Sequence, residues 1–146
     1  MMRVYTRVMD MDTCICTGLR QAAFDITEIY DSYLEPSGLK ITMFRILRRL
    51  SAAEQVSITE LAVIVGVDRS TLGRNLRVLE RMDLVTFEEA EDARSRTVVL
   101  TALGRSTLAK ATPLWVKAQT KMRSVLGKDL KPVFEAMTKI KHTAEA

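Results

Sequence analysis

Three arginines recur at the spacing that places them on one face of a helix. If residues 69–82 form a helix at 100° per residue, its buried stripe consists of Leu72, Leu76 and Leu79. The opposite face then carries Ser70, Arg74, Arg77 and Arg81, with Thr71 and Val78 at one edge. Guanidinium groups pair bidentately with guanine, and hydroxyls bind phosphates or base edges. This face therefore suits the major groove of DNA, although a basic helix face is often only a solvated surface.

A second group of arginines is predicted at the tip of a β-hairpin that follows this helix. The β-prone runs 84–87 and 97–100 flank a polar segment whose distal end carries Arg94 and Arg96, where a side chain can enter a minor groove. The same segment carries four acidic residues, which repel phosphate: Glu88, Glu89, Glu91 and Asp92. We therefore expect Asp92 to hold Arg94 or Arg96 in a fixed rotamer. The predicted DNA contacts are Arg69, Ser70, Thr71, Arg74, Asn75, Arg77, Arg81, Arg94 and Arg96, with Asp92 in support.

The net charge of +4 is distributed unevenly over the 146 residues. Residues 10–35 carry −5, residues 40–105 carry +2 from 11 basic and 9 acidic residues, and residues 110–141 carry +6. Every basic residue of the middle segment except Lys40 is an arginine, whose planar fork matches phosphate and base edges. The arrangement of arginine, rather than the overall charge, is what predicts a DNA-binding part.

The composition argues against an enzyme and against a metal site. The one histidine, His142, excludes a His-rich metal site and argues against a Ser-His-Asp triad. Gly66 and Gly73 form no phosphate-binding loop, and we expect no cofactor. The longest apolar run, residues 61–67, is too short to cross a bilayer, and the N-terminal segment lacks the apolar region of a signal peptide. With two cysteines only, the chain is expected to be cytoplasmic with free thiols.

The first half of the chain is predicted to contain four helices. Apolar spacing indicates one over residues 13–34 and a shorter one around residues 43–50. A capping-box pattern, Ser57 to Glu60, opens a third helix, which Gly66 ends. Asp68 can cap the arginine-bearing helix that follows.

After the hairpin, Thr101 caps a long helix that ends at Gly127 and that Pro113 is expected to bend or interrupt. A last helix follows Asp129, with the apolar stripe Leu130, Val133, Phe134, Met137 and Ile140. The predicted fold is mainly α with a small β-hairpin wing, a winged helix-turn-helix flanked by long helices whose apolar stripes need a partner. The predicted parts are an N-terminal dimerisation helix, a DNA-binding domain and C-terminal dimerisation helices, at residues 1–36, 37–104 and 105–146.

An ordered series of short motifs runs through nearly the whole chain. Upstream of the predicted helix-turn-helix they are Tyr30-Asp31, Pro36-x-Gly38-Leu39 and Phe44. Further along they are Ile58-Thr-Glu-Leu-Ala62, Val67-Asp-Arg-Ser-Thr-Leu72, Arg74-Asn-Leu-Arg77, Leu79-Glu-Arg81, Leu84-Val85, Asp92-Ala-Arg94-Ser95 and Leu100-Thr-Ala-Leu-Gly104. Together they resemble the MarR family of bacterial transcription regulators. Lys40 and Met43 depart from the Thr and Gln that are common in the family at the start of the second helix.

The resemblance implies an obligate homodimer, paired through its first and last two helices, that binds double-stranded DNA and most often represses. Each subunit would place one recognition helix in the major groove of a palindromic operator, with the wing in the adjacent minor groove. Arg94 matches the family's wing-tip arginine, and Asp92 matches the acidic residue before it. Two-fold symmetry predicts half-sites roughly 10 bp apart. The acidic first helix and the basic last helices can attract one another across the interface.

The resemblance also makes a small organic effector, often an aromatic or phenolic acid, the default signal that releases the operator. Candidate pocket residues are Tyr30, Tyr33, Phe44 and Trp115, with Arg45 or Arg48 as an anion partner. Core packing is the commoner role of such aromatic residues.

Cys14 and Cys16 support a different signal, because peroxide-responsive members of the family carry a reactive N-terminal cysteine. On a helix the two side chains point about 200° apart, so a disulfide between them needs unwinding, whereas one between subunits does not. The alternative is that both pack as small buried hydrophobes, since no Lys, Arg or His lies beside them to lower the thiol pKa. Two thiols without a histidine do not complete a tetrahedral metal site. A further alternative is a winged-helix module that binds protein instead of DNA.

Overall fold

The computed structural model describes residues 14–53, 55–89 and 96–146, and its helices follow the predicted order. The fold is mainly helical with a small antiparallel sheet. In chain order the elements are α1 (Ile15–Leu34), the 3-10 helix η1 (Glu35–Ser37), α2 (Ile41–Ala52), β1 (Val56–Ser57), α3 (Ile58–Val65), α4 (Arg69–Arg81), β2 (Val85–Glu89), β3 (Arg96–Leu100), α5 (Ala102–Leu126), the 3-10 helix η2 (Gly127–Asp129) and α6 (Leu130–Glu145).

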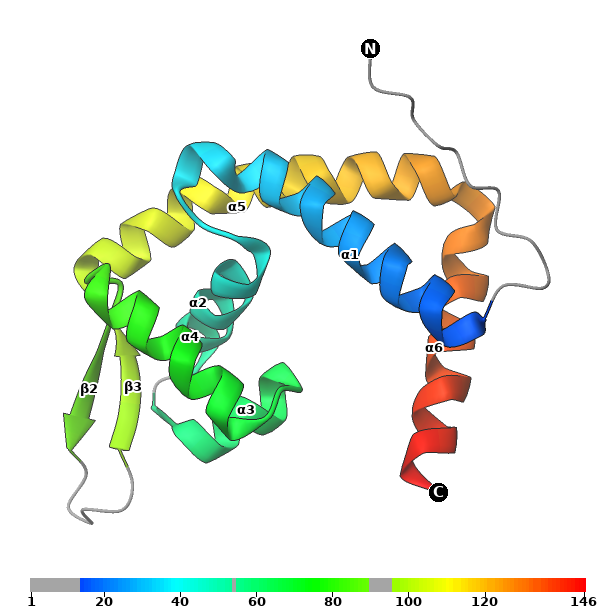
Figure 1. The fold of residues 1–146 in the computed structure, drawn as a ribbon. Helices are drawn as coiled ribbons and strands as arrows, with labels where there is room; N and C mark the ends of the chain where they lie inside the picture. The colour runs from blue at the N-terminus through cyan, green and yellow to red at the C-terminus, as the bar shows by residue number, and fades with distance from the viewer. Residues whose placement is uncertain (1–13, 54, 90–95) are drawn as a thin grey trace.

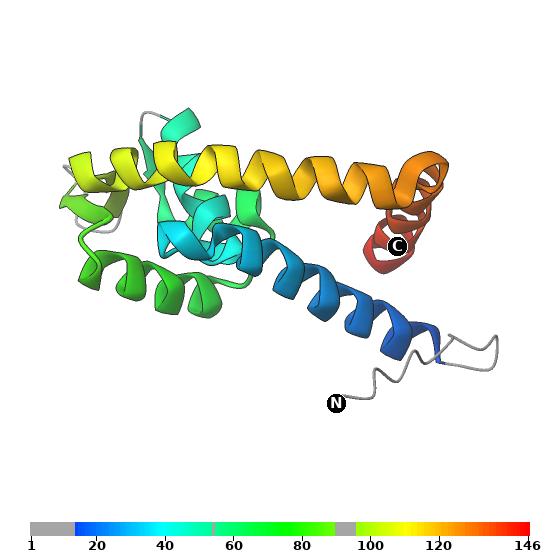
Figure 2. The ribbon, with the colours of Figure 1, turned by 90° about the horizontal axis from the view of Figure 1, so that it is seen from above.

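The longest helix, α5, connects the two parts of the molecule. In Figure 1 it runs across the top, with α2, α3, α4 and the sheet grouped below its first half and α6 turning away from its far end. Figure 2 shows α1 beside α5 at the C-terminal end of α1, and the two helices diverge toward the N-terminus. Within the described ranges, no helix combines the length and the apolar character needed to cross a membrane.

Short-range hydrogen bonds set the boundaries of α3 and α4. The Glu60 N–H donates to the Ser57 hydroxyl at 3.1 Å, and the Ser57 N–H donates to the Glu60 carboxylate at 3.3 Å, which confirms the predicted capping box. Gly66 ends α3 with φ of 75°, a left-handed conformation that favours glycine. Asp68 then caps α4, as predicted. Residues at most four apart in the chain therefore determine where α3 begins and ends and where α4 begins.

One hydrophobic core holds the small helices, the sheet and the long helices together. It includes Phe44 and Leu47 of α2, Leu61 of α3, and Val85 and Val98 of the sheet, all of them buried. The same cluster contains residues from the end of α1 and the first half of α5, namely Leu34, Leu108 and Ala111. The helix-turn-helix is thus packed directly on the long helices.

The wing has three strands, one more than the predicted hairpin. β2 pairs antiparallel with β3, from Val85 opposite Leu100 to Glu89 opposite Arg96. β1 adds to the other edge of β3, with Val56 opposite Val98, so the strand order is β1-β3-β2. A two-residue strand has no alternating pattern to detect, and its partner lies far along the chain, which is why the sequence did not indicate β1.

Of the bend or interruption predicted at Pro113, the interruption does not occur. Helix α5 runs through Pro113 without a break and ends at Gly127. A proline within a helix leaves the carbonyl of the residue four positions earlier, here Ala109, without its backbone donor. Pro113 and Ala109 are both exposed, so water can bind the freed carbonyl and the helix continues.

A close backbone contact joins the base of the wing to the start of α5. The Thr101 N–H donates to the Leu84 carbonyl at 3.1 Å, and the Thr101 hydroxyl donates to the Asp83 carbonyl. The Gly104 N–H in turn donates to the Thr101 hydroxyl oxygen at 2.9 Å. A Cβ atom built on Gly104 would lie 2.0 Å from the Leu84 carbonyl oxygen, so only glycine lets the first turn of α5 approach this closely.

We expect Gly104→Ala to lower the free energy of unfolding by about 1–3 kcal/mol, the usual cost of overpacking, because the Leu84 carbonyl cannot move aside without losing its hydrogen bond. Urea unfolding at one fixed protein concentration measures the change. Gly73→Ala is the matched control: a Cβ there meets nothing within 4 Å, and removing a glycine from a helix interior should add about 0.5–1 kcal/mol. If Gly104→Ala were as stable as the wild type, the close approach of Gly104 to the Leu84 carbonyl would be contradicted.

Candidate nucleic-acid interface

Helix α4 has the orientation that its leucine spacing predicts. Leu72, Leu76 and Leu79 are at most 1% exposed and belong to the core. The opposite face carries side chains that are all exposed: Ser70, Arg74, Arg77 and Arg81. Thr71 and Asn75 are half-buried beside this face, and Arg69 is exposed at the start of the helix. Below, these four exposed side chains are called the outer face of α4.

A dense hydrogen-bond network lies at the N-terminus of α4. One Asp68 carboxylate oxygen accepts from the Thr71 N–H at 2.8 Å and from the Ser70 hydroxyl at 2.7 Å, and the other accepts from the Thr71 hydroxyl at 2.7 Å. The Arg74 guanidinium donates to the Thr71 hydroxyl oxygen at 3.4 Å. The sequence indicated only the helix cap, whereas the structure shows that Asp68 also binds both neighbouring hydroxyls.

This network stabilises the charged form of Asp68. The pKa of its carboxyl is held far below the ordinary value, chiefly by the Thr71 hydroxyl and then by the Ser70 hydroxyl and the Thr71 N–H, all of which donate to the carboxylate. Asp68 is therefore ionised throughout the physiological pH range. It accepts hydrogen bonds and donates none.

The described part of the wing presents Arg96 and the carboxylates of Glu88 and Glu89. Arg96 opens β3, is exposed, and pairs in register with the exposed Glu89 of β2. Arg94 and Asp92 lie outside the described residues, as does Glu91, so the predicted contact of Asp92 with either arginine stays a prediction. Arg96 brings one positive charge to the wing on the strand next to its tip.

Two of the predicted ligand residues, Phe44 and Trp115, form a packing contact between helices. Phe44 is buried and stacks on Trp115, with ring centroids 5.6 Å apart. The Arg48 guanidinium carbon lies 4.4 Å from the Trp115 ring centroid, a cation–π contact. These contacts join α2 to α5. The core role that the sequence left open for Phe44 is the one that the structure shows.

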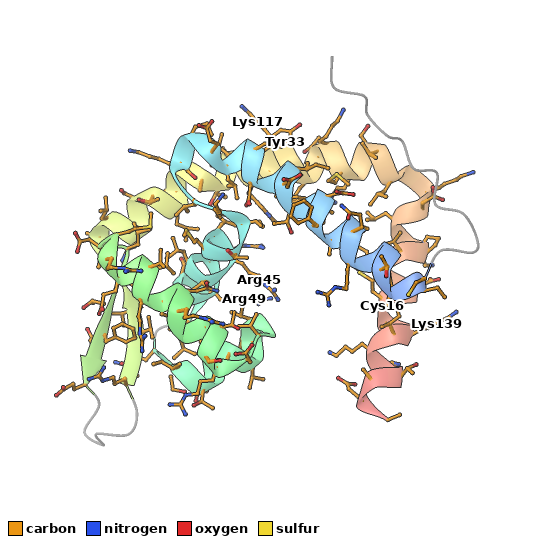
Figure 3. The ribbon with its side chains drawn as sticks, viewed as in Figure 1. Cys16, Tyr33, Arg45, Arg49, Lys117 and Lys139 are labelled. Atoms are coloured by element: carbon orange, nitrogen blue, oxygen red, sulfur yellow. The ribbon has the colours of Figure 1, made fainter. Side chains whose placement is uncertain are left out.

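The other predicted ligand residues lie on α1 and α2: Tyr30 and Tyr33 on α1, and Arg45 on α2. The Tyr30 hydroxyl donates to the Gln119 side chain on α5, and burial raises the pKa of Tyr30 despite the opposing charge of Arg123. In Figure 3, Tyr33 lies where α1 passes α5, whereas Arg45 and Arg49 project from α2 lower in the view. Arg49, which the sequence did not single out, thus lies beside Arg45, one helical turn further along α2.

Cys14 and Cys16 are both exposed free thiols in the single chain, so neither packs in the core of its own subunit. Cys14 immediately precedes α1, and the pKa of its thiol is lowered, first by the Thr17 N–H and then by the Thr17 hydroxyl and the Cys16 N–H. The free backbone N–H groups at the start of α1 thus stabilise the thiolate, as a neighbouring cation would, although the sequence places no cation beside Cys14. Within the described ranges, no group of three or more potential ligands is positioned to hold a metal ion.

Comparison with known proteins relates this geometry to DNA-bound structures. A model of the MarR family matches residues 37–95. The M. tuberculosis transcriptional regulator MosR, in its structure with DNA, shares 38% sequence identity with this chain. The two structures match with a TM-score of 0.83, and the match covers 91% of this chain and 97% of MosR. The transcriptional repressor CouR, bound to a 23-mer DNA duplex, is 26% identical with a TM-score of 0.76, covering 88% and 92%.

The S. aureus MepR–DNA complex shares the fold at 20% identity, with a TM-score of 0.79, covering 90% of this chain and 99% of that one. A comparison with curated protein sequences gave no match.

The lowered pKa of Asp68 predicts a pH-dependent contribution to stability. A carboxylate whose pKa falls on folding stabilises the folded state above its unfolded pKa, about 4 for aspartate, and loses that effect as the pH falls toward its folded value. We expect Asp68→Asn to be less stable than the wild type near pH 7, and the difference to shrink as the pH falls below about 4.

Urea unfolding of both proteins across this pH range measures the difference. Glu80→Gln, which neutralises an exposed acid on the same helix, is the control and should show no such narrowing. A difference between wild type and Asp68→Asn that stays constant with pH would show that the charge of Asp68 does not stabilise the fold.

Proposed function

The chain belongs to the MarR family of DNA-binding transcriptional regulators, and we propose that it acts as a homodimeric repressor, bound to a palindromic operator until a signal releases it. The outer face of α4 is the observation that carries the proposal. A buried leucine stripe holds this helix in the core, and three exposed arginines and a serine lie on its opposite side. An enzymatic role is not part of this function. We place its action in the cytoplasm, where the chromosome is accessible.

In the proposed complex, α4 enters the major groove and the wing reaches the adjacent minor groove. The contacts follow from the types of side chain. Arg74, Arg77 and Arg81 donate to base edges or phosphates from the outer face of α4, and Arg69, Thr71 and Asn75 lie next to that face. Arg96 and the predicted wing-tip Arg94 supply positive charge toward the minor groove, with Asp92 as the support of the wing arginines.

Exposed apolar residues on the long helices support a homodimer. On α1 they include Ile15 (79% exposed) and Phe24, and on α6 they include Phe134 (59% exposed) and Ile140. Every residue of α6 after Leu130 is exposed in the single chain. Large apolar side chains in such number usually mark a protein interface. The opposite charges of residues 10–35 and 110–141 favour contact between α1 of one subunit and the C-terminal helices of the other.

We assign residues 1–36 and 105–146 to dimerisation and residues 37–104 to DNA binding. The two parts share a core, since Phe44 of α2 stacks on Trp115 of α5. Two recognition helices related by the dimer axis would bind half-sites roughly 10 bp apart.

The releasing signal that we favour is a small aromatic or phenolic acid bound between the DNA-binding part and the long helices. At that boundary the exposed Arg48 supplies a cation, and the half-buried Trp115 ring, stacked on the buried Phe44, supplies an apolar surface. Tyr30 contacts α5 through Gln119, and Arg45 offers a further positive charge on α2. Because Trp115 is the only tryptophan, a ligand bound there would change the fluorescence of the whole protein.

Thiol oxidation is the second candidate signal, and one observation favours it. Cys14 is exposed and its thiol pKa is lowered, which are the two properties that make a cysteine reactive toward oxidants. Cys16, also exposed, lies two residues away as a partner for a disulfide between subunits.

We expect Arg77→Ala to weaken operator binding by about tenfold to a hundredfold, because it removes donors from the middle of the outer face of α4. The operator is first obtained by sequencing the DNA that the protein captures from its own genome, and affinity is then measured by fluorescence anisotropy at several salt concentrations. Wild-type binding should weaken steeply with salt, since phosphate contacts release counterions.

Lys117→Ala is the control for this experiment. It removes the same charge from an exposed position on α5, on the side of the molecule away from α4 (Figure 3). Binding by this variant should match the wild type. An Arg77→Ala affinity equal to that of Lys117→Ala would exclude α4 as the recognition helix and would favour a winged-helix module that binds protein.

We expect Phe134→Glu to convert the dimer to a monomer, because a charge in the centre of an apolar interface is left without a partner. Sedimentation velocity at micromolar concentrations distinguishes the two species. Val63→Glu is the matched control, since Val63 is 78% exposed on α3, away from the long helices, and this variant should remain dimeric. Dimers of unchanged stability in Phe134→Glu would contradict the assignment of α6 to the interface.

A further inference from the structure

The hydrogen-bond network at the start of α4 determines what its two hydroxyl groups can offer to DNA. A hydroxyl carries one proton to donate and two lone pairs that accept. An ionised carboxylate has no proton, so every hydrogen bond to Asp68 must use a proton from its partner. The Ser70 and Thr71 hydroxyls, each 2.7 Å from an Asp68 oxygen, therefore both point their protons at Asp68.

The two hydroxyl groups differ in what remains available. Thr71 is half-buried, and its oxygen already accepts from the Arg74 guanidinium at 3.4 Å. Ser70 is exposed and lies on the outer face of α4, in line with Arg74, Arg77 and Arg81. Its free lone pairs are directed away from Asp68, so Ser70 faces the groove as an acceptor.

We propose that Asp68 sets the base preference of Ser70: by holding the hydroxyl proton, it makes Ser70 an acceptor for the amino group of adenine or cytosine in the major groove. This inference rests on the proposed role of α4 as the recognition helix. In the major groove, adenine N6 and cytosine N4 are donors, whereas guanine O6 and N7 and thymine O4 are acceptors. A Ser70 hydroxyl without a free proton satisfies the donors and leaves the acceptors unpaired.

The outer face of α4 therefore presents both hydrogen-bond donors and one acceptor. Arginine only donates, so Arg74, Arg77 and Arg81 select guanine or bind phosphate. Ser70 is then the one acceptor among the four exposed side chains of that face. Without Asp68, the Ser70 hydroxyl could donate as well as accept, and the face would not distinguish an amino group from a carbonyl oxygen.

The test compares base preferences and not only affinity. The full-length wild type, Ser70→Ala, Asp68→Gly and Asp83→Asn are each used to select duplexes from one random library, and the selected half-sites are compared position by position. We expect the wild type to favour adenine or cytosine at one position of each half-site by roughly fivefold over guanine and thymine, the discrimination typical of one hydrogen bond. Ser70→Ala should lose the preference at that position and keep the others.

Asp68→Gly should broaden the same position toward guanine and thymine, because removing the carboxylate leaves the Ser70 proton free to donate, and glycine is tolerated at a helix N-cap. Asp83→Asn is the control: it removes the same charge beyond the other end of α4, where the left-handed φ of 59° suits asparagine. This variant should retain the wild-type preferences. A mere change of charge would alter both aspartate variants alike.

Three results would overturn the inference. They are an unchanged preference at every position in Ser70→Ala, a responsive position that favours guanine or thymine in the wild type, and equal broadening by Asp83→Asn and Asp68→Gly. Ser70→Ala keeps the helix-capping bond from the Thr71 N–H to Asp68, so it decides the question even where Asp68→Gly is less stable. If the wild type enriched no sequence at all, the proposed function would fail, and the inference with it.

Discussion

The burial of three leucines on one side of α4 is the constraint on which the rest of the site depends. Leu72, Leu76 and Leu79 lie in the core, and burying each is worth about 1.5–3 kcal/mol relative to exposure. A rotation of α4 by one residue would expose this stripe and drive guanidinium groups into the core, where a charge without a partner is costly. The arginines therefore face outward because the leucines cannot.

Packing contacts extend this constraint to the helices proposed to form the dimer. Gly104 lets the first turn of α5 approach the Leu84 carbonyl at the base of the wing, and Thr101 bonds the two together. On the other side, Phe44 of α2 stacks on Trp115 of α5. A ligand or an oxidised thiol that displaced α5 or α1 would act on the recognition helix through these contacts, because close-packed interiors transmit displacement.

Much of the fold followed from patterns that span only a few residues. Ser57, Glu60, Gly66 and Asp68 predicted where α3 begins and ends and where α4 begins, because helix caps are local hydrogen bonds. The two-residue strand β1 could not be predicted, since its partner Val98 is remote in the chain. Helix α5 continues through Pro113 where Pro113 and Ala109 are exposed, and a short sequence pattern does not predict that exposure.

The spacing of leucine and arginine alone determined which face of α4 is outward, because the period of the helix assigns each residue to a side. The tertiary structure decided what the polar groups on that face can do. It directs the Ser70 and Thr71 hydroxyl protons to Asp68, leaves the Cys14 thiol exposed beside free amides, and stacks Trp115 of α5 on Phe44 of α2. The residue type determines which hydrogen bonds and contacts a side chain can make, and the positions of its neighbours determine which of these it does make.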